Sequence, residues 1–105
     1  MTYKFNGDRY MTKGIQAEIP FDIQTVIWLL INENVKKGLK MDYLQVFNLS
    51  PCYKDGIMYQ RLIHSQEVPK RKKELTLYMV DKAITAKIFV IDDIDHITML
   101  LADEY

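Results

Sequence analysis

The strongest periodic pattern of apolar residues lies in residues 19–38. At about 100° per residue, most of its apolar side chains fall on one face and polar side chains fall opposite. Pro20 suits the first position of a helix, and Gly38 suits the left-handed residue that ends one. Asp22 near the start and Lys36 near the end complement the helix dipole. This stretch therefore predicts one main amphipathic helix.

Alternation of apolar and polar residues, which is typical of half-buried strands, marks most of the remaining chain. Residues 43–52 and 57–68 predict a hairpin, because Asp55 and Gly56 between them form a tight-turn sequence. Residues 97–105 are compatible with a short helix or a final strand. We expect an α+β fold, with the helix packed on a largely antiparallel sheet of about five strands. The further strands are expected at residues 9–19, where Gly14 would form a bulge, and at residues 74–80 and 86–91, and residues 70–73 are expected to be a connector.

Length and composition limit the classes of function. The chain has 105 residues, which is the size of one domain, so we expect residues 1–105 to form a single α+β unit. It has 14 basic and 14 acidic residues, and this balance disfavours a general nucleic-acid binder or a membrane-surface protein. Cys52 is the only cysteine, which favours a reducing compartment, and no apolar run is long enough to cross a bilayer. We expect a cytoplasmic protein, and a net charge of zero also tolerates self-association.

Leu29 falls on the polar face of the predicted helix, with Trp28 at the margin of the apolar face. A lone exposed leucine is ordinary on a protein surface, so Leu29 has an incidental interpretation. The alternative is a partner-binding surface formed by Trp28 and Leu29 together.

A cluster of acidic residues and histidine directly follows the strand expected at residues 86–91. Carboxylates suit hard cations, and a neutral imidazole suits zinc or manganese. The alternative is an acidic turn whose side chains bind local backbone N–H groups. If the hairpin strand at residues 57–68 lay beside the strand at residues 86–91, a small metal-dependent enzyme site would result. The candidate metal ligands are His64, Glu67, Asp92, Asp93, Asp95 and His96.

Four consecutive cations, Lys70, Arg71, Lys72 and Lys73, follow the predicted hairpin. Tyrosines in the flanking strands would supply stacking surfaces, so a single-stranded nucleic acid is a candidate ligand of this run. The alternative is a solvated loop, which the balanced charge of the chain favours.

The sequence contains no glycine-rich phosphate loop, no nucleophile elbow and no paired cysteines. The missing motifs favour a protein that is not an enzyme, and we expect no cofactor.

Seven blocks of sequence follow one another along nearly the whole chain: RYMTKGI (9–15), IP (19–20), DYLQVF (42–47), HSQEVP (64–69), VIDD (90–93), DH (95–96) and MLLADEY (99–105). Together they resemble an uncharacterised family of Firmicutes and their phages, the domain of unknown function number 960. The resemblance implies a short, soluble, cytoplasmic protein, phage-associated or accessory, with no assigned activity and no known catalytic residues. It also implies that glycine often stands at the position of Ile94.

The sequence as a whole predicts a non-enzymatic accessory or protein-interaction module. It would bind a protein partner or a second copy of itself through Trp28 and Leu29, or through an exposed sheet edge. The small metal-dependent enzyme and the single-strand nucleic-acid binder stay open as alternatives.

Overall fold

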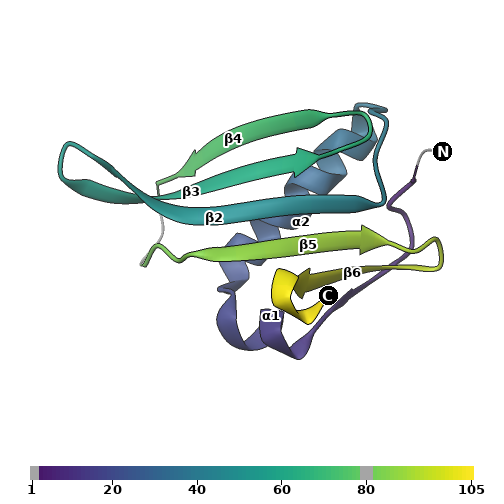
Figure 1. Cartoon of the computed structure of the whole chain (residues 1–105), viewed down its shortest axis with the longest axis horizontal. Helices are drawn as coiled ribbons and strands as arrows, with labels where there is room; N and C mark the ends of the chain where they lie inside the picture. The colour runs from purple at the N-terminus through teal and green to yellow at the C-terminus, as the bar shows by residue number, and fades with distance from the viewer. Residues whose placement is uncertain (1–2, 79–81) are drawn as a thin grey trace.

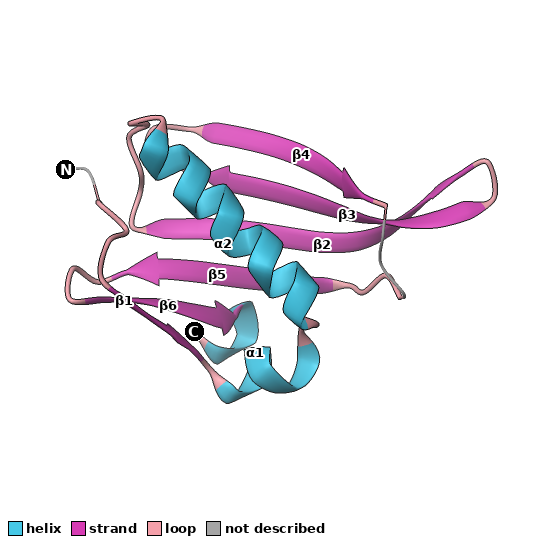
Figure 2. Cartoon of the chain, turned by 180° about the vertical axis from the view of Figure 1, so that it is seen from behind, coloured by secondary structure: helices cyan, strands magenta, loops and turns pink. Residues whose placement is uncertain are grey.

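A six-stranded sheet is the frame of the molecule, and helix α2 (Phe21–Lys36) crosses one of its faces diagonally (Figures 1 and 2). The computed structural model describes residues 3–78 and 82–105. The order across the sheet is β1-β6-β5-β2-β3-β4, and all neighbours pair antiparallel except β1 and β6, which are parallel. The fold is therefore α+β, with six strands instead of about five. The strands are β1 (Asp8–Met11), β2 (Leu44–Lys54), β3 (Ile57–Gln66), β4 (Arg71–Leu77), β5 (Ala86–Asp92) and β6 (His96–Leu101).

Helix α2 ends where its local sequence predicts and begins at Phe21, one residue after the predicted start. Pro20 is its N-cap residue, and Gly38 has a positive φ of 70° just beyond its end. The Gly38 N–H donates to the Val35 carbonyl at 3.0 Å, and the Leu39 N–H donates to the Asn34 carbonyl at 3.1 Å. These two bonds form a Schellman motif, which satisfies carbonyls that the helix end would otherwise leave free. The predicted main helix is confirmed.

Strands β2 and β3 form the predicted hairpin, with Asp55 and Gly56 as its two-residue turn. Both turn residues have positive φ, 52° and 78°, as a type I′ turn requires. The pairing of β2 with β5 stops at Leu49, and the pairing of β3 with β4 stops at Gln60. Residues 51–59 therefore extend beyond the rest of the sheet as a two-stranded projection (Figure 1), which we call the hairpin arm.

The strand predicted at residues 9–19 is wrong beyond Met11, because helix α1 (Lys13–Glu18) occupies its second half. Ile15 and Ile19 are both buried, and their spacing of four residues fits one face of a helix as well as it fits alternation. Thr12 caps this helix, since its Oγ1 accepts a hydrogen bond from the Ile15 N–H at 3.3 Å. Gly14 is therefore a helical residue and not a bulge.

Strand β4 and the tail of the chain also differ from the sequence prediction. Strand β4 begins at Arg71, so the basic run expected to be a connector mostly belongs to a strand, and residues 79 and 80 of the predicted strand lie outside the described residues. The tail contains both alternatives in turn, because β6 is followed by a single 3₁₀ turn, η1 (Ala102–Glu104).

The core lies between the sheet and the two α-helices, which both cover the same face (Figure 2). Strand alternation directs Phe47 of β2 and Val90 of β5 into this layer, where neither side chain is exposed. On the opposite face, the ring of the C-terminal Tyr105 packs edge-on against Phe89 at a centroid distance of 5.6 Å. Among the described residues, no helix has the length and apolar character that a membrane crossing requires.

Candidate functional site

A pocket of about 270 Å³ opens on the helix-covered face, between the second half of α2 and the start of β4. At about 30 Å³ per water molecule in the liquid, this space suits one small molecule or one group of a larger ligand. The side chains of Leu30 and Leu39 give the pocket an apolar wall. Its polar residues are Glu33, Asn34 and Lys37 around α2, Gln45, His64, Ser65 and Gln66 on β2 and β3, and Arg71, Lys72 and Lys73 on β4.

Strand register brings the basic residues of β4 to the polar residues of β3. Lys73 pairs with His64, and Arg71 pairs with Gln66. Directly paired residues share one face of a sheet, so all four side chains point to the side that α2 covers. Lys72 lies between them and is directed to the opposite face by strand alternation.

A chain of buried amides fixes the protonation of His64. The Gln66 side-chain amide donates to the carbonyl oxygens of Lys40 at 3.1 Å and Pro69 at 2.7 Å. Its oxygen can then only accept, and it accepts from the Gln45 amide at 2.9 Å. This leaves the Gln45 oxygen facing His64 Nε2 at 2.7 Å. Because that oxygen cannot donate, His64 Nε2 carries the proton.

His64 is neutral, and its second nitrogen is an acceptor. Burial, and after it the charges of Arg71 and Lys73, together lower the pKa of the imidazole to about 4. With the proton on Nε2, Nδ1 holds a lone pair. Within the described residues, Nδ1 makes no hydrogen bond. Every side-chain nitrogen or oxygen that is fully buried in this part of the chain does have a hydrogen-bond partner, so Nδ1 is not fully buried. Nδ1 is therefore in contact with solvent, which reaches His64 through the pocket.

Cations outnumber carboxylates around the pocket. Lys37, just beyond the end of α2, and Arg71 and Lys73 of β4 line it, with Glu33 as the carboxylate on the helix side. The Arg71 guanidinium donates to the Lys40 carbonyl, which holds the side chain in place. The resulting positive potential, in a partly enclosed space, attracts anions.

The predicted basic run thus contributes to a pocket instead of a continuous stripe. Lys70 is an exposed residue of the turn before β4, and Lys72 lies on the other face from Arg71 and Lys73. The tyrosines that flank the run, Tyr59 and Tyr78, pack against one another with ring centroids 4.8 Å apart.

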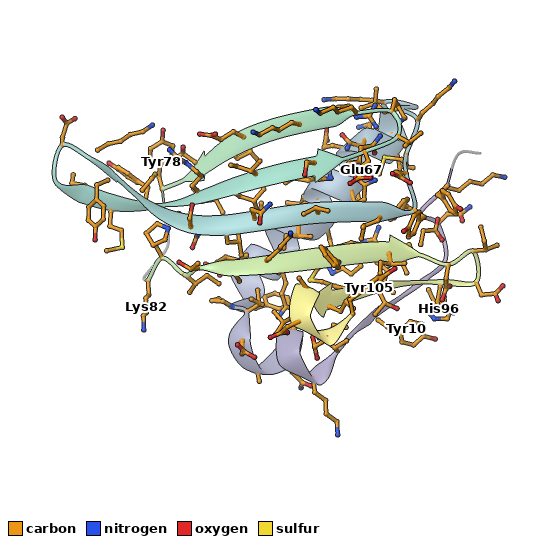
Figure 3. The ribbon with its side chains drawn as sticks, viewed as in Figure 1. Tyr10, Glu67, Tyr78, Lys82, His96 and Tyr105 are labelled. Atoms are coloured by element: carbon orange, nitrogen blue, oxygen red, sulfur yellow. The ribbon has the colours of Figure 1, made fainter. Side chains whose placement is uncertain are left out.

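The structure does not bring the six candidate metal ligands together. Strand β2 lies between β3 and β5, so the two strands that the metal hypothesis places side by side are not neighbours. By register, Asp92 also lies four residues further along its strand than the partner row of His64. Figure 3 shows Glu67 beside the end of β3, and His96 next to Tyr10 at the other edge of the sheet, where their rings are 5.4 Å apart. Among the described residues, no three His, Cys, Asp or Glu side chains are grouped so that they could hold a metal ion.

The acidic residues at the end of β5 and in the turn after it have structural partners within the fold. Asp92 is buried, and its carboxylate accepts from the N–H groups of Phe5 and Ile94, both at 2.9 Å. The Asp93 carboxylate accepts from the His96 N–H at 3.0 Å and pairs with His96 Nε2 at 2.9 Å. Asp95 is exposed. This geometry is that of the acidic turn, the alternative interpretation of the cluster.

The helix surface at Trp28 and Leu29 is small. The Trp28 ring lies under the Arg9 guanidinium at 4.6 Å, and this contact joins β1 to α2. Leu29 is 55% exposed, as expected from its place on the polar face. A larger exposed apolar surface belongs to the hairpin arm, where Tyr53 and Ile57 are 67% and 56% exposed.

Sequence reasoning missed Gln45 and Gln66, which organise the pocket. Gln45 has the same strand parity as the buried Phe47, and Gln66 has the same parity as the buried Leu62. A polar residue at a core position of an alternating strand was the available signal, because a buried amide needs hydrogen-bond partners.

The fold and the pocket together define a small single-sheet α+β protein with a basic, partly buried site. The chain belongs to the family described as Staphylococcal protein of unknown function (DUF960), which matches residues 8–104. This confirms the family resemblance of the sequence blocks. The chain is also similar to a protein of unknown function from Enterococcus faecalis known from a crystal structure, with 27% sequence identity and a TM-score of 0.78. The similarity covers 100% of this chain and 98% of that one. No curated protein matches the chain significantly.

Proposed function

We propose that the protein is a non-enzymatic binding module whose pocket between α2 and β4 holds a small anionic group. The observation that supports this most strongly is the convergence of Arg71 and Lys73 on the buried, neutral His64. An arginine presents a planar fork of donors that matches a phosphate or a carboxylate, and lysines add compact positive charge. The apolar wall of Leu30 and Leu39 suits the remainder of a small ligand.

The hydrogen bonding of His64 favours binding over catalysis. Its Nε2 donates to an amide oxygen of Gln45, and no hydroxyl or thiol is hydrogen-bonded to the ring within the described residues. A histidine that activates a nucleophile needs such a hydroxyl or thiol within hydrogen-bond reach. The role of His64 in this proposal is to shape and polarise the pocket.

An NMR titration of backbone amides with inorganic phosphate and with acetate tests the proposal. We expect saturable shifts confined to the pocket, meaning the end of α2 and the start of β4. Arg71→Gln and Lys73→Gln should each weaken binding about tenfold or more, since hydrogen bonds to charged groups contribute roughly 1.5–3 kcal/mol.

Lys54→Gln is the matched control, because it removes one positive charge at the tip of the hairpin arm and leaves the pocket intact. It should leave the affinity unchanged. Shifts that never saturate, or an equal effect of Lys54→Gln and Lys73→Gln, would show general ionic attraction and would contradict a pocket.

The hairpin arm favours a second candidate, an accessory protein-interaction module. Tyr53 and Met58 are directly paired and share one face of the arm, and Ile57 lies on the other, so apolar side chains are exposed on both faces. Pro51 follows the last β2–β5 pair and has no N–H, so it protects this edge against strand addition. A partner would therefore bind the arm through its side chains, with an apolar groove of its own.

The arm and the helix surface can be separated by matched variants. We expect Ile57→Asp to abolish co-purification of a specific protein partner from the host and Leu29→Asp to retain it. Sedimentation of the purified wild type and the two variants distinguishes a second copy from a different protein. Loss of the partner with Leu29→Asp alone would contradict the arm and support the surface at Trp28 and Leu29.

A further inference from the structure

We infer that the pocket selects an anion that still carries a proton, a hydrogen-phosphate group, over a fully ionised oxyanion such as sulfate. This inference rests on the proposed function, because it names the ligand class of the same pocket. It follows from one atom, His64 Nδ1, whose lone pair is not used by the hydrogen bond of Nε2 and which belongs to a pocket that Arg71 and Lys73 also line.

Backbone carbonyls determine the direction of the hydrogen bonds that end at the other ring nitrogen, His64 Nε2. The carbonyls of Lys40 and Pro69 can only accept, so they orient the Gln66 amide. A third carbonyl, that of Asp42, accepts from the Gln45 amide at 2.9 Å and independently orients Gln45. Both amides therefore require a proton on His64 Nε2, because the other tautomer would place two acceptors face to face.

A sulfate oxygen beside Nδ1 would place its own lone pair against the lone pair of the nitrogen, and this contact is repulsive at hydrogen-bond distance. A hydrogen-phosphate group can place its O–H there and donate, while its other oxygens accept from Arg71 and Lys73. The second ionisation of a phosphate monoester has a pKa of about 6, so roughly a tenth of it keeps this proton at pH 7 and about half at pH 6.

The shared proton stays on the ligand because His64 binds a proton weakly. Burial opposes the imidazolium, and so do the cations Arg71 and Lys73 of β4. The charged residues that line the pocket from the helix side are Lys37, just beyond the end of α2, and Glu33, the carboxylate among the described lining residues. Sulfate can gain a hydrogen bond only if His64 takes up a proton. Its affinity should therefore rise as the pH falls toward 4, the approximate pKa of His64.

Isothermal titration calorimetry of the full chain with inorganic phosphate and with sulfate, near neutral pH and at equal ionic strength, tests the selection. We expect phosphate to bind at least about ten times more tightly than sulfate. This difference corresponds to one hydrogen bond that phosphate gains where sulfate would have a repulsive contact. Two variants of His64 isolate the responsible atom. The side-chain amide of Gln reproduces the Nε2 donor to Gln45, whereas the side-chain oxygen of Asn reproduces the Nδ1 acceptor.

His64→Gln should lose the preference for phosphate, and His64→Asn should keep it. Equal affinities of the two anions for the wild type would overturn the inference and leave the anion pocket standing. If neither anion shows saturable binding, the proposed function fails together with the inference. Circular dichroism of the variants shows whether they fold, and the wild-type comparison decides the question if they do not.

Discussion

His64 should make the stability of the protein depend on pH in a defined interval. Burial and then the nearby cations lower its pKa from 6.5 to about 4 in the folded state. The unfolded state therefore binds more protons between these two pH values. The contribution of His64 to the free energy of unfolding should be fully present above pH 6.5 and should be lost as the pH falls from 6.5 through about 4. The fall is at most about 1.4 kcal/mol for each pH unit in this interval.

Chemical denaturation of the wild type and His64→Gln as a function of pH measures this contribution. The difference between the two curves should decrease as the pH falls from 6.5 to about 4 and be constant elsewhere. Parallel curves throughout would show that His64 is not held neutral by its surroundings.

Ile94 is a second residue with a measurable conformational effect. Its φ is 83°, a left-handed conformation in which a β-branched side chain is strained, and its side chain is 64% exposed. Ile94→Gly should therefore stabilise the protein by up to about 1 kcal/mol, with little apolar burial lost. Urea denaturation measures the change. Ile94→Ala is the control, and an equal gain from alanine would show that the exposed isoleucine side chain, and not the backbone, is responsible.

At the scale of elements, helix α1 and the turn η1 are held together by Glu104. Its carboxylate accepts from Thr12 Oγ1 at 2.6 Å and from the Leu101 N–H at 2.8 Å, and these bonds lower its pKa. A Cβ on Gly14 would lie 2.7 Å from the same carboxylate. Glycine at this helical position therefore leaves room for the Glu104 carboxylate, although alanine favours helices.

A double-mutant cycle tests this contact. Gly14→Ala should not stabilise the wild type, because the new methyl group displaces the Glu104 carboxylate from its hydrogen bonds. In a Glu104→Ala background the same substitution should stabilise the fold by up to about 1 kcal/mol, through helix propensity alone. Equal effects in both backgrounds, measured by urea denaturation, would contradict a contact between Gly14 and Glu104.

The elements that the sequence predicts are those with local determinants. Helix α2 is defined by Pro20, by its apolar face and by Gly38, and the hairpin by Asp55 and Gly56. Helix α1 has no comparable local signal, because Ile15 and Ile19 fit a strand pattern as well. Its position depends in part on Glu104, which lies 92 positions from Thr12 in the sequence. A contact of this kind has no trace in the local pattern of residues.

At the scale of the whole molecule, strand order decides which side chains form a site. The sequence shows His64 and the basic run separately, and only the β3–β4 register brings His64 beside Lys73. The sequence alone equally allows His64 to lie near the acidic residues that end β5. In the structure this does not happen, because β2 lies between β3 and β5. The chemical types of the site were thus visible in the sequence, whereas their combination depended on topology.

Binding in the pocket should stabilise the whole chain. A ligand present at a hundred times its dissociation constant raises the free energy of unfolding by about 2.7 kcal/mol. Phosphate should have this effect on the wild type in urea denaturation. Phosphate also stabilises proteins by exclusion from their surface, so Arg71→Gln supplies the baseline. Equal stabilisation of wild type and Arg71→Gln would assign the whole effect to exclusion and contradict specific binding.

The most direct test of the anion pocket is long-range ¹H–¹⁵N NMR of the His64 ring, with and without phosphate. Near neutral pH we expect a neutral ring with its proton on Nε2, and a shift of the Nδ1 resonance that saturates as phosphate is added. A ring that is charged near neutral pH, that carries its proton on Nδ1, or that is unaffected by phosphate would contradict the structure of the site and its proposed ligand.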